Sequence, residues 1–512
     1  MGDDVIVLAP TAVEADVMGA GTVVTGTGAA PVADIVAKLL PTLGPRTAVA
    51  VAGTSARLRT DLVPGQLVVA NELWATGPGR GTGTGTGTLR LVRLLPSAAL
   101  LAAELRREGH PVSVGPVVSV TDGGGGPAEG PEGPGTLGQA GALVVDHDSA
   151  WAATLADGDR PLAVVRAVEA PFGPGAMAAV GTRRTAASLA GVRAPIERWA
   201  RACGSRRVVL ASPRSFCAGV ERAIEIVERA LDRYGAPVYV RRQIVHNTHV
   251  VGRLAAMGAV FVEELDEVPD GATVVLAAHG VSPEVRAEAA ARDGFTVIDA
   301  TCPLVAKVHH EARRYAARGF EIVLVGHDDH EEVVGTYGEA PERMHVVTCG
   351  TDVDALQLEP DAPVAFLTQT TLATDETAGV VDALRRRFPG VVGPSADDIC
   401  YATQNRQDAV RAIARECDLM LVVGSSNSSN TARLVEVALR EGCRAELVED
   451  AGQLRLSWLD GAGTVGITAG ASAPESLVTE VVRALSALGP TEVDERRTTT
   501  ETVRFSLPLQ VR

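Results

Sequence analysis

The second half of the chain repeats one pattern, in which an apolar run ends in a polar loop and a helical pattern follows. The six segments are VVLASPRSFC (208–217), VVLAAHG (274–280), IVLVGHDDHEE (322–332), VAFLTQTT (364–371), LMLVVGSSNSSN (419–430) and VGITAGAS (465–472). Continuous apolar runs predict strands that are buried on both faces, and therefore parallel sheets covered by helices. Because ligands bind such sheets at the carboxyl ends of the strands, we expect these loops to converge on one site.

The first half also shows α/β patterning. The strand-like segments VIVLA (5–9), AVAVAG (48–53) and QLVVA (66–70) alternate with helix-like segments such as PVADIVAKLL (31–40). Two glycine-rich insertions lack an apolar face and are expected to be surface loops, at 77–88 and 122–135.

A polar, basic segment interrupted by Gly and Pro separates the halves at 181–206, and it predicts a linker with one helix inside it. We therefore expect an N-terminal α/β domain over 1–180 and a second part over 207–512. A length of 512 residues is enough for three or four domains, each with its own core.

Composition and charge narrow the class of protein. With 54 Gly, 29 Pro and 3% aromatic residues, the chain has the composition of a globular protein rich in small residues. A net charge of −16 argues against nucleic acid or an anionic membrane as partner, since both require basic surface. The start MGDDVIVLAP lacks the features of a signal peptide, and no run approaches the ~18 apolar residues of a membrane span. We expect a cytoplasmic protein.

Three of the seven cysteines lie in polar loops that follow apolar runs. They are Cys217 in PRSFCAGVERA, Cys302 in DATCPLVAKVH and Cys400 in DDICYATQNR, too far apart to be a local metal clip. After the first loop, apolar residues at helical spacing predict an amphipathic helix whose N-terminal amides favour a thiolate at Cys217. Three thiolates are one fewer than the four that close an all-cysteine iron–sulfur or zinc site, so one metal atom would stay open to substrate.

Polar residues of the other loops suggest an anion site. His246, His279 and His330 occur in three different loops, together with the strings SSNSSN and TAGAS. Imidazoles, hydroxyls and amides without Lys or Arg can hydrogen-bond an anion such as a diphosphate while leaving protons available. Glu332, two residues after His330, is a candidate proton donor.

These segments resemble, in order and spacing, the LytB/IspH family of diphosphate reductases of the non-mevalonate isoprenoid pathway. The resemblance covers roughly 207–512 and rests on PRSFCAGVERAIEIVERAL, YVRRQIVHN, AAHGVSPEVR, DATCPLVAKVH, LTQTTL, DDICYATQNRQ, GSSNSSNTARL and TAGASAPE. It implies three small α/β domains around a central [4Fe-4S] cluster, at approximately 207–300, 301–395 and 396–487, with a tail at 488–512. It also implies reductive dehydroxylation of an allylic alcohol diphosphate to isopentenyl and dimethylallyl diphosphates, with electrons from a ferredoxin- or flavodoxin-type protein.

The resemblance assigns a role to each candidate residue. The cluster ligands would be Cys217, Cys302 and Cys400. The diphosphate would be held by His246, His279, Ser428, Ser429, Asn430 and Ser472. His330 and Thr370 would lie beside the substrate hydroxyl, and Glu332 would supply protons to it. The chain departs from the family pattern at Ser215, Glu331, Val334 and Ser426, where the family usually has Gly, Pro, Glu and often Lys.

The first half resembles the nucleoside phosphorylase/nucleosidase superfamily in VVTGTGAAPVADIVAKLL, VAGTSARLRTDLVPGQLVVANEL, ALVVDHDSAWAA and LAVVRAVEAP. The Met-Glu pair that grips ribose in that family is replaced by His147 and Asp148, and the Asp expected after Arg166 falls at Ala170. Without that proton donor a leaving base is poorly stabilised, so we expect a degenerate domain without nucleoside cleavage. It could serve as a scaffold, a dimerisation domain or a nucleoside sensor.

Three hypotheses for the function remain. The first is the diphosphate reductase itself. The second is an iron–sulfur reductive dehydratase with another substrate, which the departures at Ser215, Glu331 and Val334 would permit. The third is a non-catalytic redox sensor coupled to a nucleoside-binding N-terminal domain, although a sensor does not need the substrate-binding residues that this chain retains.

Overall fold

The computed structural model describes residues 5–27, 29–44, 47–77, 88–120, 141–156, 160–171, 183–394 and 398–512. The glycine-rich insertions expected at 77–88 and 122–135 lie almost wholly outside the described residues. The chain forms two compact units. Unit 1 comprises Met1–Arg207, Ala451–Gly463 and Glu480–Glu492, and unit 2 comprises Val208–Asp450, Thr464–Thr479 and Val493–Arg512. Helices and strands alternate in both, so the α/β class expected from the sequence is confirmed.

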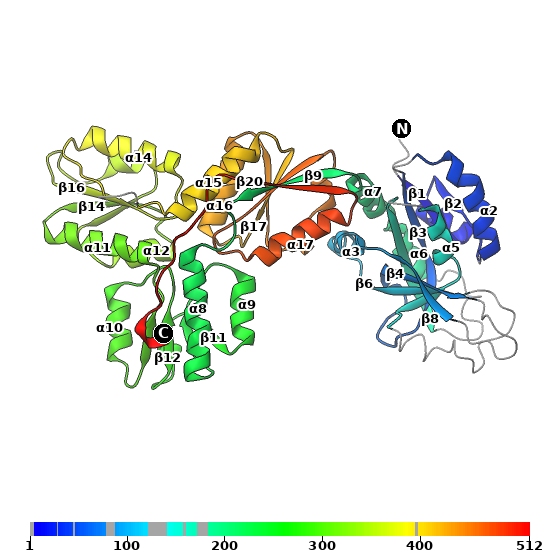
Figure 1. The fold of residues 1–512 in the computed structure, drawn as a ribbon, viewed down its shortest axis with the longest axis horizontal. Helices are drawn as coiled ribbons and strands as arrows, with labels where there is room; N and C mark the ends of the chain where they lie inside the picture. Colours follow the sequence, from blue (N-terminus) through cyan, green and yellow to red (C-terminus); the bar gives the residue numbers. More distant parts are fainter. Residues whose placement is uncertain are drawn as a thin grey trace. The chain divides into compact units, whose positions relative to one another are not determined.

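Unit 1 is built on a mixed eight-stranded sheet (Figure 1). Its strands are β1 (Val5–Ala9), β2 (Thr22–Val24), β3 (Ala48–Arg57), β4 (Leu67–Gly77), β5 (Thr88–Leu94), β6 (Val112–Ser119), β7 (Val144–Asp146) and β8 (Leu162–Pro171). The sheet closes on itself, because β8 pairs with both β3 and β4 while β7 joins β3 to β6. The helices of this part are α1 (Ala12–Met18), α2 (Ala29–Leu39), α3 (Ala98–Arg107) and α5 (Ser149–Ala152), with 3-10 turns η1 (Leu40–Thr42) and η2 (Ala153–Leu155).

The segment expected to be a linker at 181–206 instead carries two helices of unit 1, α6 (Arg183–Ala190) and α7 (Arg193–Ala202). The sequence looks polar there because the charged residues of α7 occupy one face. The other face buries Ile196 and Trp199 completely, and the indole Nε1 of Trp199 donates a hydrogen bond to Ser97 at 3.1 Å. Burying an aromatic side chain of this size stabilises a fold by several kcal/mol, about 3–5 on truncation to Ala. This segment is therefore packed rather than a free connection.

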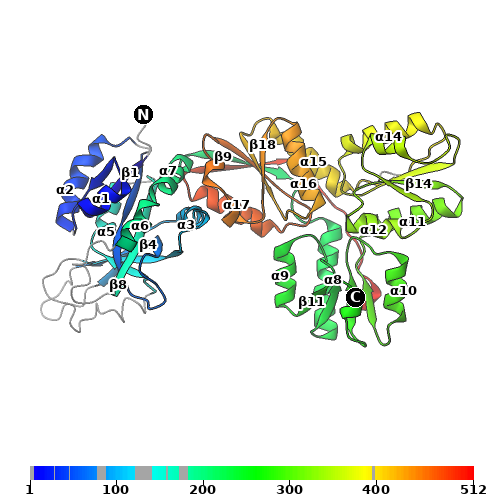
Figure 2. The ribbon, with the colours of Figure 1, turned by 180° about the vertical axis from the view of Figure 1, so that it is seen from behind.

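Unit 2 contains three sheets, each covered by helices (Figures 1 and 2). The first has the order β11-β10-β12-β13 and is fully parallel. Its strands are β10 (Val238–Arg241), β11 (Ala259–Val262), β12 (Thr273–Leu276) and β13 (Thr296–Asp299). The elements that accompany it are α8 (Ala218–Tyr234), α9 (Thr248–Ala256), η3 (Leu265–Glu267) and α10 (Pro283–Ala291).

The second sheet is also parallel, with the order β15-β14-β16. Its strands are β14 (Glu321–Val325), β15 (Met344–Val347) and β16 (Val364–Thr368). The accompanying helices are α11 (Pro303–Ala317), α12 (Glu331–Tyr337), α13 (Gly350–Ala355) and α14 (Thr374–Arg387). The parallel pairing that continuous apolar runs predict is confirmed in both sheets.

The third sheet has the order β18-β17-β19-β9-β20. Its strands are β9 (Arg206–Ser212), β17 (Leu419–Val423), β18 (Arg444–Val448), β19 (Thr464–Ala469) and β20 (Thr491–Arg497). It is accompanied by α15 (Tyr401–Ala414), α16 (Ser429–Arg440) and α17 (Glu475–Ser486), and the chain ends in η6 (Leu509–Val511). The 3-10 turns η4 (Ala451–Gln453) and η5 (Leu456–Trp458) belong to unit 1. The expected subdomain at 207–300 differs in one respect, because β9 leaves it for this sheet, where β17 is buried along its whole length.

Candidate active site

Three helices of unit 2 begin at the three candidate cysteines. Cys217 is the N-cap of α8, Cys302 the N-cap of α11 and Cys400 the N-cap of α15. Each thiol therefore lies at the positive end of a helix, where the free backbone N–H groups favour a negative ligand. All three cysteines line one cavity of unit 2.

The surroundings of the thiols fit a cluster better than three ordinary buried cysteines. Burial raises the pKa of Cys302 to about 12 and that of Cys400 to about 11, and the neighbouring cysteines add to both shifts. Without a metal these thiols therefore stay protonated. A Cβ added at Gly219 would lie 2.7 Å from the Cys302 sulfur and 3.8 Å from the Cys217 sulfur, so only glycine leaves this space open. The Thr403 N–H donates to the Cys400 sulfur at 3.3 Å, as expected around a thiolate ligand.

A buried carboxyl group lies in the same cavity. Glu332 is the second residue of α12, and Thr370 follows β16. The Thr370 backbone N–H donates to Oε1 of Glu332 at 2.7 Å, and the Thr370 hydroxyl donates to Oε2 at 2.9 Å. Burial raises the pKa of Glu332, and these two hydrogen bonds offset only part of the effect. A carboxyl group that keeps its proton longer than usual can act as a general acid.

Three imidazoles face one another beside this acid. The rings of His246 and His279 are stacked with centroids 4.0 Å apart, and the His330 ring lies edge-on to both, at 5.6 and 6.0 Å. Burial and the neighbouring imidazoles lower the pKa of His246 to about 3 and that of His330 to about 4. Nδ1 of His330 accepts a hydrogen bond from the Glu332 N–H at 3.1 Å, so the proton of the neutral ring is on Nε2.

The N-terminus of α16 supplies hydroxyl and amide groups. The Ser429 and Thr371 hydroxyls lie 3.0 Å apart, and Ser472 donates to Ser428 at 3.3 Å and to the His246 carbonyl at 3.0 Å. Asn430 is only 5% exposed, yet neither its amide nitrogen nor its oxygen has a hydrogen-bond partner among the described residues. Such an unpaired buried amide costs free energy unless a ligand binds it.

All the site residues that the sequence predicts line this one cavity of about 110 Å³. They are Cys217, Cys302, Cys400, His246, His279, His330, Glu332, Thr370, Ser428, Ser429, Asn430 and Ser472. Sequence reasoning missed Gly219, Thr371 and Thr403, which also line it. Their positions beside the motif residues were visible, but a single glycine or threonine carries no chemical signal of its own.

The departures from the expected family pattern differ in their surroundings. Ser215 has a positive φ of 61°, and its hydroxyl donates a hydrogen bond to Glu475 at 2.6 Å. The side chain of Val334 is exposed. Glu331 faces the histidines, and one of its oxygens lies 3.3 Å from Nδ1 of His279. Although burial acts to raise the pKa of Glu331, its contact with the His279 imidazole and the positive charge of Arg242 lower it overall.

Two of the residues singled out in the N-terminal half, Asp148 and Arg166, belong to a buried ion network with Asp146 in unit 1. Arg166 lies 2.8 Å from carboxylate oxygens of both Asp146 and Asp148, and none of the three side chains is more than 3% exposed. Burial raises the pKa of Asp148, which shares one guanidinium with Asp146. Nδ1 of His147 contacts the Val120 carbonyl at 3.1 Å, whereas the side chain of Ala170 lies outside the described residues.

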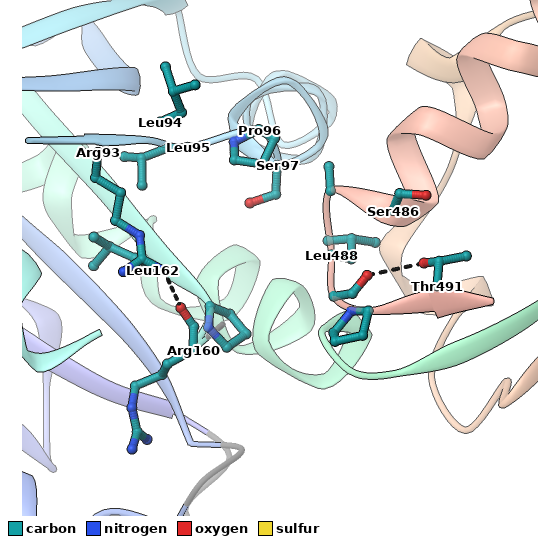
Figure 3. Close-up of a pocket in the computed structure, with 14 residues that line it drawn as sticks. Arg93, Leu94, Leu95, Pro96, Ser97, Arg160, Leu162, Ser486, Leu488 and Thr491 are labelled. Atoms are coloured by element: carbon teal, nitrogen blue, oxygen red, sulfur yellow. Dashed lines mark hydrogen bonds between the residues drawn. The ribbon is translucent and has the colours of Figure 1, made fainter. Parts of the chain in front are cut away.

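A second cavity lies within unit 1 and contains none of the predicted site residues (Figure 3). Its volume is about 440 Å³. Its lining includes Arg93 and Arg160, but Arg93 donates to the Arg160 carbonyl at 2.9 Å and Arg160 donates to the carbonyls of Gly44 and Thr47. Its polar groups are thus engaged with the backbone.

Comparisons with known proteins agree on the second half of the chain. The profile of the family described as LytB protein matches residues 208–486. A 4-hydroxy-3-methylbut-2-enyl diphosphate reductase of Cutibacterium acnes is 56% identical over 61% of this chain and 96% of its own. The solved structure of the E-1-hydroxy-2-methyl-but-2-enyl-4-diphosphate reductase of Plasmodium falciparum is 37% identical, with a TM-score of 0.58 over 60% of this chain and 97% of that one.

A further solved structure, a Helicobacter pylori 5'-methylthioadenosine/S-adenosyl homocysteine nucleosidase, is 13% identical. It covers 38% of this chain and 97% of its own, with a TM-score of 0.31. Among the described residues, no helix combines the length and apolar character needed to cross a membrane.

Proposed function

Because this chain belongs to the LytB protein family, we propose that it reduces 4-hydroxy-3-methylbut-2-enyl diphosphate to isopentenyl and dimethylallyl diphosphates. The observation that carries this proposal is the meeting, in one cavity, of three helix-capping cysteines with the buried pair Glu332 and Thr370. The first group can hold a redox centre, and the second can deliver a proton.

The reaction consumes two electrons and two protons. The allylic C–O bond breaks, a C–H bond forms, and the oxygen leaves as water. Cys217, Cys302 and Cys400 would hold a [4Fe-4S] cluster, which supplies electrons and a Lewis-acidic iron when it is bound. The glycine at position 219 supports this proposal, because any larger residue would intrude between the thiols.

Glu332 would protonate the leaving hydroxyl through Thr370. Its two hydrogen bonds from Thr370 fix the carboxyl group, and its raised pKa lets it keep its proton to a higher pH than an ordinary carboxyl group. His330, with its proton on Nε2, would donate a hydrogen bond to the same hydroxyl.

The diphosphate would bind in the part of the cavity away from Glu332 and Thr370. The polar groups available are those of His246, His279, Ser428, Ser429, Asn430 and Ser472. The unpaired amide of Asn430 and the serine hydroxyls at the start of α16 can donate to phosphate oxygens, and the helix N-terminus favours the negative charge. An anion bound there would also raise the pKa of His246, so that its imidazole could bind the anion as a cation.

The remaining parts of the proposal concern the cellular compartment, the electron donor and the N-terminal domain. We propose a cytoplasmic enzyme, in which the ligand thiols stay reduced, and a ferredoxin- or flavodoxin-type protein as electron donor. We further propose the N-terminal domain to be inactive towards nucleosides, because Asp148 is tied to Arg166 and buried.

The decisive experiment is anaerobic purification followed by an assay with the allylic diphosphate and a chemical reductant. We expect iron and sulfide in the protein and formation of both C5 diphosphates. A protein that carries the cluster but converts only a different allylic or hydroxylated substrate would favour the alternative dehydratase. A cluster that is reduced and oxidised without any turnover would favour a sensor.

A further inference from the structure

Each helix that begins at a candidate cluster ligand carries a cationic side chain in its second turn. A cation on a helix is usually solvated, so the sequence alone gives these three no special role. In the structure, each of them is bonded to the loop of a different cysteine. They are Arg222, five residues after Cys217 in α8, Lys307, five residues after Cys302 in α11, and Arg406, six residues after Cys400 in α15.

Arg222 joins α8 to the loop of Cys302. Its Nη1 atom donates hydrogen bonds to the carbonyls of Ala300 and Thr301, both at 3.1 Å, and Thr301 directly precedes Cys302. Its Nε atom donates to the carbonyl of Ser506 at 2.9 Å. Among the described residues, the hydrogen bonds of this guanidinium all go to neutral carbonyl groups.

Lys307 joins α11 to the loop of Cys400. Its Nζ atom lies 3.0 Å from Oδ1 of Asp398, two residues before Cys400. The side chain of Asp398 is completely buried, and its other oxygen accepts a hydrogen bond from the Thr368 N–H at 3.1 Å. Because Asp398 is thereby anchored to the end of β16, the ion pair fixes the loop of Cys400 against α11.

Arg406 joins α15 to the loop of Cys217. Its side chain is completely buried, and Nε and Nη2 donate to the Ser215 carbonyl at 3.0 and 2.7 Å. Nη2 also donates at 3.2 Å to the carbonyl of Phe216, which directly precedes Cys217. The carboxylate of Glu501 lies 3.0 Å from Nη1. A planar guanidinium that donates to a loop in this way fixes it more firmly than a lysine would.

The three contacts close into a ring around the cysteines. The helix that begins at each cysteine holds the loop that leads into another one: α8 holds the loop of Cys302, α11 that of Cys400 and α15 that of Cys217. A displacement of one cysteine would therefore strain two contacts of the ring. None of the three cations belongs to the described lining of the substrate cavity, so they do not serve to bind the diphosphate.

The charges of the ring are not all balanced. Two of its cations have a carboxylate partner, Asp398 in one case and Glu501 in the other. Arg222 is hydrogen-bonded to carbonyls alone, and Asp299, whose charge also acts on it, is exposed to screening by solvent. A cluster on three thiolates becomes more negative when it takes up an electron, and nearby positive charge stabilises that form.

We infer that Arg222, Lys307 and Arg406 are positioning residues that hold the three cysteine loops at the spacing of the cluster, and that the charge of Arg222 raises the reduction potential of the cluster. The inference rests on the cluster of the proposed function but not on the identity of the substrate. It assigns the outer face of the cysteine loops a role in tuning electron uptake.

The test of the charge is an anaerobic redox titration of the cluster without substrate, followed by electron paramagnetic resonance. Arg222→Gln removes the charge and keeps an amide donor, so the ratio of reduced to oxidised cluster at a fixed potential should fall about tenfold, or about 59 mV for one electron. Arg222→Lys keeps the charge and should restore most of the ratio. The matched control is Arg229→Gln, which removes an exposed charge of the same helix, paired with Glu225, and should leave the ratio unchanged.

Glu501→Gln tests the sign of the effect. The amide oxygen can still accept a hydrogen bond from Arg406, but the charge of the guanidinium is no longer balanced, so the ratio should rise. The rise should be roughly threefold, because Glu501 is partly exposed and its charge is partly screened. Loosened packing does not produce shifts of opposite sign in Arg222→Gln and Glu501→Gln.

Lys307→Met tests the positioning role by breaking the ring at a second point. Retention of iron and sulfide against a chelator should fall roughly tenfold, and Lys307→Arg should restore it. Full retention in Lys307→Met, an unchanged potential in Arg222→Gln, or a fall of the ratio in Glu501→Gln would overturn the inference. If Arg222→Gln loses its cluster while Arg229→Gln keeps it, the positioning role is supported and Glu501→Gln decides the role of charge. A wild type without iron and sulfide would instead refute the proposed function.

Discussion

Replacing Glu332 by Gln tests the proton pathway with little change in shape. The amide oxygen can still accept the 2.7 Å hydrogen bond from the Thr370 N–H, and the Thr370 hydroxyl can turn to accept from the new NH₂ group. Both contacts therefore survive, and the structural cost should stay below about 1 kcal/mol. The carboxylic proton is lost, and general acids contribute roughly 10²–10⁴-fold to rate. We expect turnover to drop about a thousandfold, equivalent to ~4 kcal/mol of transition-state stabilisation.

The assay is anaerobic turnover of the allylic diphosphate with a chemical reductant, together with substrate binding, which should be retained. Asp328→Asn, at an exposed position of the same loop, is the control and should keep full activity. Near-normal turnover of Glu332→Gln would refute the assignment, because protons would then enter by another route.

The same substitution predicts a pH effect on stability. Burial raises the pKa of Glu332 in the folded protein above the ordinary value of 4.5, so the folded form favours the protonated carboxyl group. The wild type therefore has its full relative stability below pH 4.5 and loses it as the pH rises through the folded-state pKa. Anaerobic thermal unfolding at pH 5 and pH 8 should show that the stability of Glu332→Gln relative to the wild type is greater at pH 8 than at pH 5.

Three further predictions concern the cluster and the fold. Cys302→Ser should remove the colour, iron and sulfide of the protein, because it takes away a thiolate ligand; full iron and sulfide content would contradict the ligand assignment. Gly219→Ala should lower cluster content, since its Cβ would lie 2.7 Å from the Cys302 sulfur, whereas Gly252→Ala, with no atom within 4 Å of the added Cβ, should not; equal iron content in both would show that the space is not needed. Trp199→Ala should destabilise unit 1 by about 3–5 kcal/mol in urea unfolding followed by circular dichroism, and an effect as small as that of exposed Val13→Ala would mean that α7 is not part of the core.

Much of unit 2 could be predicted because its signals are local. Apolar runs such as Val364–Thr368 and Leu419–Val423 are strands, and α8 begins directly after Cys217. The residues of the cavity could be predicted because each follows the carboxyl end of a strand, where ligands bind, although these strands belong to three different sheets. Sequence reasoning passed over the short strands β10, β11, β13 and β15, whereas β12, of the same length, was recognised because its apolar run ends in the polar loop of His279.

Other features depend on long-range packing that a sequence pattern does not record. The exchange of β9 into the sheet of β17 and β19 pairs residues more than 200 positions apart. The burial of Trp199 depends on Ser97 and its neighbours, which lie far away in the sequence. The position of Glu331 against His279 likewise follows only when both loops are placed, so its charge could be noticed in the sequence but its neighbours could not.

The return of the chain to unit 1 affects how the protein is made. Unit 1 includes Ala451–Gly463 and Glu480–Glu492 besides the first 207 residues, and α3 and α7 contact η4 and η5 in the first of these segments. Residue 451 leaves the ribosome 244 residues after residue 207, a delay of about 12 to 50 s at roughly 5–20 residues per second. During that time the faces of α3 and α7 lack their partners and are open to chaperones or to other nascent chains. Translation speed between these two points therefore becomes a determinant of the yield of folded enzyme.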